Sequence, residues 1–242
     1  MGKKKVTTTT VVEEIVDDNK PKASRILVVL DRSGSMQSCR DEAINGYNKF
    51  LADQQALPGE CSFSLMLFDN VIEDPVVDMP IKNVAPLNHD TFVPRGMTAL
   101  YDAVGTMINR HSFNHNPNVK TILVILTDGE ENSSRNYNMH SVGQLIKNIE
   151  KEHGWETLFL GSGFNVDAVA NNIGVKSMNR MQFSTAAAGQ TVGSYTVASA
   201  SATAYRSGTQ AVMMNAVNIA DPLAVQKVLD DAQKAAKAAE AK

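Results

Sequence analysis

The chain has 242 residues, a hydrophobic fraction of 43% and a formal net charge of −3. This length fits one large domain with or without appended segments, and the nearly balanced charge argues against nucleic acid and anionic membrane surfaces as partners. No apolar run approaches the ~20 residues that a membrane-spanning helix needs.

The first 23 residues differ in composition from the rest and predict a flexible tail over residues 1–23. Lys, Thr, Glu and Asp dominate this segment, and its basic start lacks the apolar core of a secretory signal. Val11-Val12 and Ile15-Val16 are two small apolar patches that could form an edge strand or contact a partner. Without a signal we expect a cytoplasmic location, where Cys39 and Cys61 would remain free thiols.

From Ser24 onward, apolar strands alternate with helices. The run that contains Pro75 is expected at an edge of the sheet, because proline cannot donate to a strand ladder. In chain order the expected elements are strand 26–30, helix 40–57, strand 61–68, edge strand 71–79, helix 98–110, strand 121–126, helix 142–153, strand 156–160, helix 166–173 and strand 181–184. This alternation predicts an α/β fold with a mainly parallel central sheet, one antiparallel edge strand and helices on both faces.

Beyond Ser184 the composition shifts towards Ala, Ser, Thr and Gly, which favours a long helix over residues 186–205. Asp221-Pro222 is a typical helix start, with an N-cap residue followed by proline, and apolar residues then recur at helical spacing. We therefore predict one domain over residues 24–206 and a helical extension over residues 207–242. This last helix could pack on its own domain or on another chain.

The segment Asp31-Arg32-Ser33-Gly34-Ser35 directly follows the first buried strand. Alternate residues of an extended turn point the same way, so Asp31, Ser33 and Ser35 can present one carboxylate and two hydroxyls to one point. Oxygen ligands suit a hard divalent cation such as Mg²⁺. Two neutral hydroxyls and one acid leave such a cation short of negative charge, so the site would bind an acidic group from elsewhere.

Two later residues belong to the same predicted edge of the sheet. Thr98 lies where a loop becomes a helix, and Asp128 follows the second fully apolar strand. Open α/β sheets bind ligands beyond the carboxyl ends of their strands, where these residues are expected. Thr98 alone would be an ordinary N-cap and Asp128-Gly129 alone an ordinary turn, so the prediction depends on their combination with the first segment.

This combination resembles the von Willebrand factor A (vWA) domain with its metal-ion-dependent adhesion site, whose pattern is Asp-x-Ser-x-Ser, a distant Thr and a distant Asp-Gly. The segments TALYDAV and LTDGEEN look most like stand-alone bacterial and phage members. The resemblance implies a Rossmann-like domain that binds Mg²⁺ or Mn²⁺, directly or through water, with Asp31, Ser33, Ser35, Thr98 and Asp128. One coordination position would stay open for a Glu or Asp carboxylate of a partner protein.

The predicted function is a metal-dependent protein-binding module and not an enzyme. A structural subunit of a virion or another assembly, joined through its terminal segments, is compatible with the same residues, and a phage-encoded chain could be virion-associated. A magnesium-dependent phosphatase of the haloacid dehalogenase class also has an Asp after its first strand. It needs a second Asp two residues later as acid and base, and Ser33 stands there in this chain.

Other polar residues near these motifs have ordinary interpretations. Glu131 fits a solvated turn or a role in partner choice, and Asp69 fits a turn. Asp102 fits a cap, a surface position or a contact with a loop amide, and His111 fits the exposed end of a helix. The N-terminus of the helix that follows Thr98 is expected to favour an anion.

Overall fold

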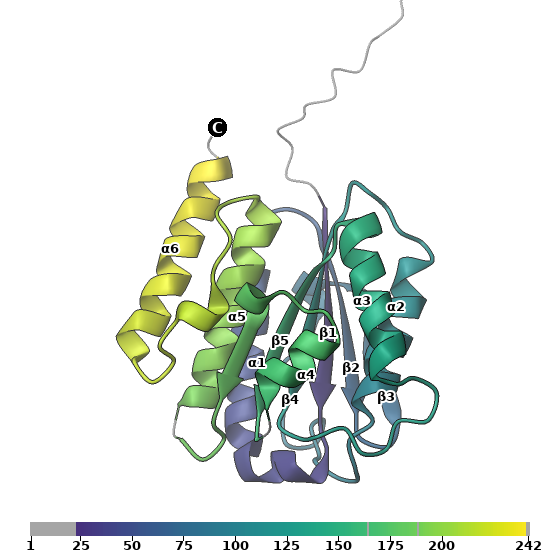
Figure 1. Ribbon diagram of the computed structural model, residues 1–242. Coiled ribbons are helices and arrows are strands. Elements are labelled where there is room, and N and C mark those ends of the chain that lie inside the picture. The colour runs from purple at the N-terminus through teal and green to yellow at the C-terminus, as the bar shows by residue number, and fades with distance from the viewer. Residues whose placement is uncertain (1–22, 164, 188, 241–242) are drawn as a thin grey trace, which may run out of the picture.

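The computed structural model describes residues 23–163, 165–187 and 189–240 (Figure 1). The tail predicted over residues 1–23 therefore lies almost wholly outside the described residues. A six-stranded sheet forms the centre, in the order β3-β2-β1-β4-β5-β6. Its strands are β1 (Ser24–Asp31), β2 (Cys61–Phe68), β3 (Ile72–Pro80), β4 (Lys120–Thr127), β5 (Glu156–Ser162) and β6 (Arg180–Phe183).

The sheet is parallel except at one edge. β1 pairs in parallel with both β2 and β4, and parallel pairing continues through β5 to β6, whereas β3 runs antiparallel to β2. Pro75 lies in β3, at the edge of the sheet. An edge strand tolerates proline, because one side of the strand needs no N–H group to pair with a neighbour. The predicted α/β class, with one antiparallel edge strand, is confirmed.

Helices cover both faces of the sheet (Figure 1). Along β1, Ile26, Val28 and Leu30 contact the side covered by α1 (Arg40–Gln55) and α5 (Gln190–Ser207). The alternating residues Leu27 and Val29 face the side covered by α2 (Leu100–Ser112), α3 (Met139–His153) and α4 (Val166–Asn172). A strand that is buried on both faces needs a continuous apolar sequence, which β1 has.

The last helix, α6 (Pro222–Glu240), packs on α5 of its own domain. Leu229 and Ala232 of α6 are buried in a cluster with Ala200 of α5. Asp221 caps the helix as expected, because its Oδ1 accepts a hydrogen bond from Leu223 N at 2.9 Å. The apolar stripe that the sequence shows in this region therefore already has a partner within the chain.

Two helices begin later than the sequence suggests. α2 begins at Leu100 instead of Thr98, and α5 begins at Gln190 instead of residue 186. Gly189 has a φ of 78°, a left-handed conformation that glycine adopts readily, and the helix starts only after it. Thr98 consequently lies in the loop before α2, outside the regular helix.

The strand order places β1 and β4 side by side, although β2 and β3 lie between them in the chain. Open α/β sheets bind ligands at such a switch point. The carboxyl ends of β1 and β4 lie towards the bottom of Figure 1, whereas β1 begins and α6 ends near the top.

Cys39 and Cys61 are buried free thiols. In the described part of the chain, no helix is long and apolar enough to span a membrane.

Candidate metal centre

Asp31 is the last residue of β1 and is fully buried, with 0% of its surface exposed. Its Oδ1 accepts a hydrogen bond from Ser33 N at 2.6 Å, and its Oδ2 accepts one from Thr127 Oγ1 at 2.6 Å. The first bond closes a short turn that keeps Ser33 next to the carboxylate. The second bond joins the carboxyl ends of the neighbouring strands β1 and β4.

The hydroxyls of the first segment lie beside the second acidic residue. Ser33 Oγ is 3.0 Å from Ser35 Oγ, and Ser35 Oγ donates a hydrogen bond to Asp128 Oδ1 at 2.6 Å. Ser33 is buried, whereas Ser35 is exposed. This group of oxygen atoms is therefore open to solvent on the side of Ser35.

The position of Gly129 shows that Thr98 joins the same group. A Cβ built on this glycine would lie 2.9 Å from Thr98 Oγ1, 3.4 Å from Ser35 Oγ and 3.6 Å from Ser33 Oγ. Three hydroxyl oxygens thus surround the space over one glycine, next to Asp128 in the chain. The structure brings together all five residues that the sequence singled out, which are Asp31, Ser33, Ser35, Thr98 and Asp128.

The two carboxylates lie in an unfavourable electrostatic setting. Burial raises the pKa of Asp31 from 3.8 to about 6, although hydrogen bonds from Thr127 and Ser33 lower it and the charge of Asp128 adds to the rise. Burial also raises the pKa of Asp128. Among the described residues, neither carboxylate forms an ion pair with a basic side chain. Two neighbouring acids without a cation of the protein create a site of uncompensated negative charge.

The donor atoms fit a divalent cation that prefers oxygen. In the described part of the chain, no group of three or more His, Cys, Asp and Glu side chains could hold a metal. The candidate site instead combines three hydroxyl oxygens with two carboxylates, and Mg²⁺ and Mn²⁺ favour such oxygen ligands. The role of these residues as metal ligands stays a prediction.

A salt-bridge network that sequence reasoning missed holds the first segment in place. Arg32, only 4% exposed, binds Asp69 Oδ2 at 3.1 Å and Glu73 Oε2 at 2.7 Å. Arg95 binds the same Asp69 Oδ2 at 3.0 Å. Hydrogen bonds and charge from Arg32 and Arg95 lower the pKa of Glu73 to about 2. Asp69, which we expected in a plain turn, thus joins the Asp31–Ser35 segment to the loop before Thr98.

Three further expectations need correction. Glu131 does not lie in a merely solvated turn, because its Oε2 accepts a hydrogen bond from Tyr101 N at 3.0 Å. The N-terminus of α2, which we expected to favour an external anion, is therefore already occupied by an internal one. His111 is 4% exposed, so it is not at an exposed helix end. It does lie in the last turn of α2, where its Nδ1 is 3.7 Å from Asp78 Oδ1 of β3.

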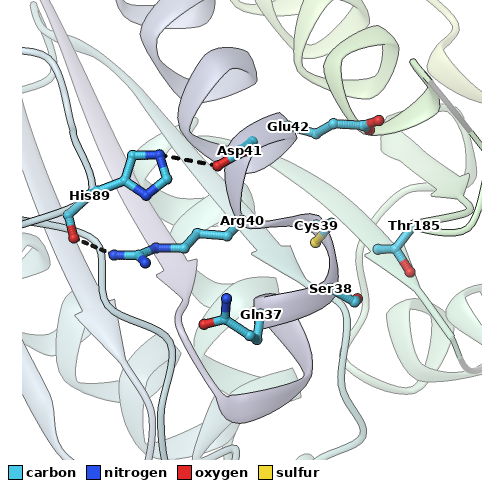
Figure 2. Close-up of a pocket in the computed structure, with 8 residues that line it drawn as sticks. All are labelled: Gln37, Ser38, Cys39, Arg40, Asp41, Glu42, His89 and Thr185. Atoms are coloured by element: carbon cyan, nitrogen blue, oxygen red, sulfur yellow. Dashed lines mark hydrogen bonds and ion pairs between the residues drawn. The ribbon is translucent and has the colours of Figure 1, made fainter.

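A cavity of about 340 Å³ lies at the start of α1 (Figure 2). Ser38, which lines it, donates a hydrogen bond from Oγ to the backbone oxygen of Ser35 at 3.1 Å. Asp41 Oδ1 lies 3.1 Å from His89 Nε2, and Arg40 donates to the carbonyl of His89. The residues that line the cavity do not include the five of the candidate site; they are Gln37, Ser38, Cys39, Arg40, Asp41, Glu42, His89 and Thr185.

No protein-family model and no curated protein matches the chain. Solved structures do match it. Manganese-loaded TRAP protein of Plasmodium vivax aligns with a TM-score of 0.53 and 12% identity, over 69% of this chain and 70% of that one. The VWA domain of SpRpn10 aligns with a TM-score of 0.50 and 11% identity, over 67% of this chain and 87% of that domain.

Proximal thread matrix protein 1 from the mussel byssus aligns with a TM-score of 0.50 and 18% identity, over 68% of this chain. The match spans only 44% of the mussel protein. The chain has the vWA fold. One structure of the mussel protein has a zinc-occupied metal-ion-dependent adhesion site, at 17% identity and a TM-score of 0.50. At these identities the likeness establishes the vWA fold and not a shared activity.

Proposed function

We propose that this vWA-fold chain is a protein-binding module whose binding depends on a divalent cation. The observation that carries the proposal is the convergence of three hydroxyls and two carboxylates at the carboxyl ends of β1 and β4, centred on Gly129. Zinc and manganese in two structures of this fold support a divalent cation. The choice between Mg²⁺ and Mn²⁺ follows from oxygen chemistry only and stays a prediction.

Each residue has a distinct part in this proposal. Asp31 is buried and fixed by its bonds to Ser33 N and Thr127 Oγ1, so it supplies negative charge at a defined place. Ser33, Ser35 and Thr98 supply neutral oxygens, and Asp128 supplies the second charge. When bound, a divalent cation would offer residual positive charge on the exposed side of Ser35. A Glu or Asp carboxylate of a partner protein suits that position.

Binding without catalysis agrees best with the residue types present. A phosphatase that uses Asp31 as nucleophile would need an acid two residues later, and the Ser33 hydroxyl has no suitable pKa for proton transfer. Self-assembly through the terminal segments remains a second prediction. α6 buries Leu229 and Ala232 against α5, so an assembly through this helix would have to use its outer face. Cytoplasmic location and bacterial or phage origin also stay predictions.

Affinity capture tests the proposal directly. The full chain, immobilised and offered a native cell extract, should retain a partner in Mg²⁺ and release it in EDTA. Asp31→Ala should lose this partner, whereas Asp230→Ala, at an exposed position on α6, should keep it. Modification of the partner's carboxyl groups to amides should also abolish binding. Equal capture with EDTA, or by Asp31→Ala, would contradict metal-dependent binding.

A further inference from the structure

The N-terminus of α2 has no cap of its own. Its N-cap residue is Ala99, whose side chain cannot accept a hydrogen bond. The loop that follows Asp128 provides the acceptor, because Glu131 Oε2 binds Tyr101 N at 3.0 Å. The loop that carries Thr98 is therefore held by the loop that carries Asp128.

Asp102 strengthens this connection from the side of α2. Its Oδ1 accepts hydrogen bonds from Asn136 N and Tyr137 N, both at 2.8 Å, and its Oδ2 accepts one from Arg135 N at 2.9 Å. In return, Ser134 Oγ accepts a hydrogen bond from Asp102 N at 3.0 Å. Backbone and side-chain bonds thus run in both directions between the start of α2 and residues 131–137.

Asn132 makes the hydrogen bonds that lie nearest to Thr98, one of the candidate metal ligands. Its Oδ1 accepts a hydrogen bond from Thr98 N at 2.9 Å. On the other side of the same residue, Thr98 O accepts hydrogen bonds from Asn132 N at 3.0 Å and from Ser133 N at 3.2 Å. The backbone on both sides of the Thr98 side chain is therefore fixed by one short stretch after Asp128.

We propose that Asn132 is a positioning residue of the metal site, which sets Thr98 Oγ1 against Asp128, with Asp102 and Glu131 supporting the same loop. The inference rests on the proposed function, because a cation bound between the two loops is what would make their separation matter. Removing a residue that orients a metal ligand typically weakens metal binding about 10- to 100-fold.

The fold itself does not depend on this side chain. Leu100, Val104 and Ile108 of α2 are buried against the sheet, whereas Asn132 is exposed. Its removal leaves the apolar packing of α2 and the backbone bonds from Asn132 N and Ser133 N in place. A loss of affinity without a loss of stability is therefore the expected signature.

The test compares three variants of the full chain. Asn132→Ala should bind Mn²⁺ about 10-fold more weakly than the wild type in titration calorimetry, and its melting temperature in EDTA should be unchanged. Asn132→Asp keeps the acceptor for Thr98 N and should restore the affinity. Asn136→Ala is the matched control, since Asn136 is an exposed asparagine of the same loop whose side chain contacts Asp102 and not Thr98.

Amide hydrogen exchange of the protein in EDTA gives a readout that needs no metal. The Thr98 amide should exchange faster in Asn132→Ala than in the wild type or in Asn136→Ala. Wild-type affinity in Asn132→Ala would overturn the inference and leave the proposed function intact. A lower melting temperature with unchanged affinity would also overturn it, because it would show a purely structural role. Absence of Mn²⁺ binding by the wild type would refute both proposals.

Discussion

The two ends of the central sheet both contain buried ionisable groups, but they balance charge differently. At the carboxyl ends of β1 and β4, Asp31 and Asp128 have only hydroxyls and amides as partners. At the amino end of β1, Asp78 Oδ1 lies 3.5 Å from Arg25 Nε and 3.7 Å from His111 Nδ1. The second end is internally neutralised, and the first is not.

This difference supports the proposal that a ligand binds at the carboxyl end of the sheet. A charge that is paired within the chain is compensated there, whereas two neighbouring carboxylates without a counter-ion destabilise their ionised forms, and a bound cation would relieve this. The carboxyl end also joins loops from distant parts of the chain, including Ser35 and Thr98. The carboxyl end has its own paired charges, where Arg32 binds Asp69, but the carboxylates of Asp31 and Asp128 lie outside that network. The uncompensated charge is therefore specific to the candidate site.

The largest expected effect is a loss of Mn²⁺ affinity when the charge of Asp31 is removed. Removing the charge of Asp78, at the other end of the sheet, provides the comparison. Asp31→Asn should weaken Mn²⁺ binding at least 100-fold, because half of the negative charge at the site is lost while the shape is kept. Asp78→Asn should leave Mn²⁺ affinity unchanged and lower the free energy of unfolding by at most about 1 kcal/mol, as for other partly exposed ion pairs. Calorimetric titration and urea unfolding would measure both variants. Equal metal affinities in the two variants would remove the distinction between the ends.

The second prediction concerns the metal-free protein and pH. Because the pKa of Asp31 rises from 3.8 to about 6 on folding, the native state binds more protons than the unfolded chain between these values. The stability contributed by the neutral carboxyl is complete below pH 4 and is lost as the pH rises through 6. Each pKa unit corresponds to about 1.4 kcal/mol, so the total loss is about 3 kcal/mol.

Urea unfolding in EDTA at several pH values between 4 and 7 would show this slope. Asp31→Asn should reduce this slope and leave the part that comes from Asp128, whose pKa burial also raises. Saturating Mn²⁺ should reduce it in the wild type, since a bound cation favours the ionised carboxylates. If wild type and Asp31→Asn have the same slope in EDTA, the buried carboxyl is not the source of uncompensated charge.

A smaller effect is expected from adding one methyl group. Gly129→Ala places a Cβ about 2.9 Å from Thr98 Oγ1, closer than van der Waals contact allows. Thr98 would have to move, and Mn²⁺ affinity should fall about 10-fold, as it does when a metal ligand loses its orientation. Gly154→Ala is a useful control, because its φ of 65° carries strain but nothing lies within 4 Å of the added atom. The control should lower stability only, and calorimetry with thermal unfolding separates the two outcomes.

The smallest expected effect is a change in the pH dependence of stability caused by His111, at the amino end of the sheet. Burial lowers the pKa of His111 from 6.5, with Asp78 and Asp74 opposing this and Arg25 and Arg110 assisting it. The stability from the neutral imidazole is present above pH 6.5 and is lost as the pH falls, opposite in sign to the effect of Asp31. His111→Gln should flatten the slope of stability just below pH 6.5 without changing Mn²⁺ affinity. A change in Mn²⁺ affinity would contradict this prediction, because it would show that the amino end of the sheet influences the candidate metal site.

Much of the fold could be predicted from short-range patterns. The short apolar runs of β1, β2 and β4 favoured strands buried on both faces, and Pro75 favoured an edge strand, as the structure has them. The site residues followed from the same logic, because loops at the carboxyl ends of neighbouring parallel strands must meet. Metal binding by these residues is a separate prediction that the geometry supports and only experiment can decide.

The residues that sequence reasoning missed act through long-range hydrogen bonds. Thr127 binds Asp31 between the ends of two strands, and Asn132 binds Thr98 between two loops, in each case far apart in sequence. No periodicity indicates such bonds, because they depend on how two irregular loops settle against each other. The loop that carries Thr98 is fixed by the same bond, and α2 begins two residues later, at Leu100.

The path of the chain has a practical consequence. β1 begins and α6 ends at the end of the molecule opposite the carboxyl ends of β1 and β4 (Figure 1). A bead, a fluorophore or a carrier protein joined before β1 or after α6 would therefore sit behind the oxygen-lined end. Whether it is attached before β1 or after α6, the molecule would present the oxygen-lined end to the solution.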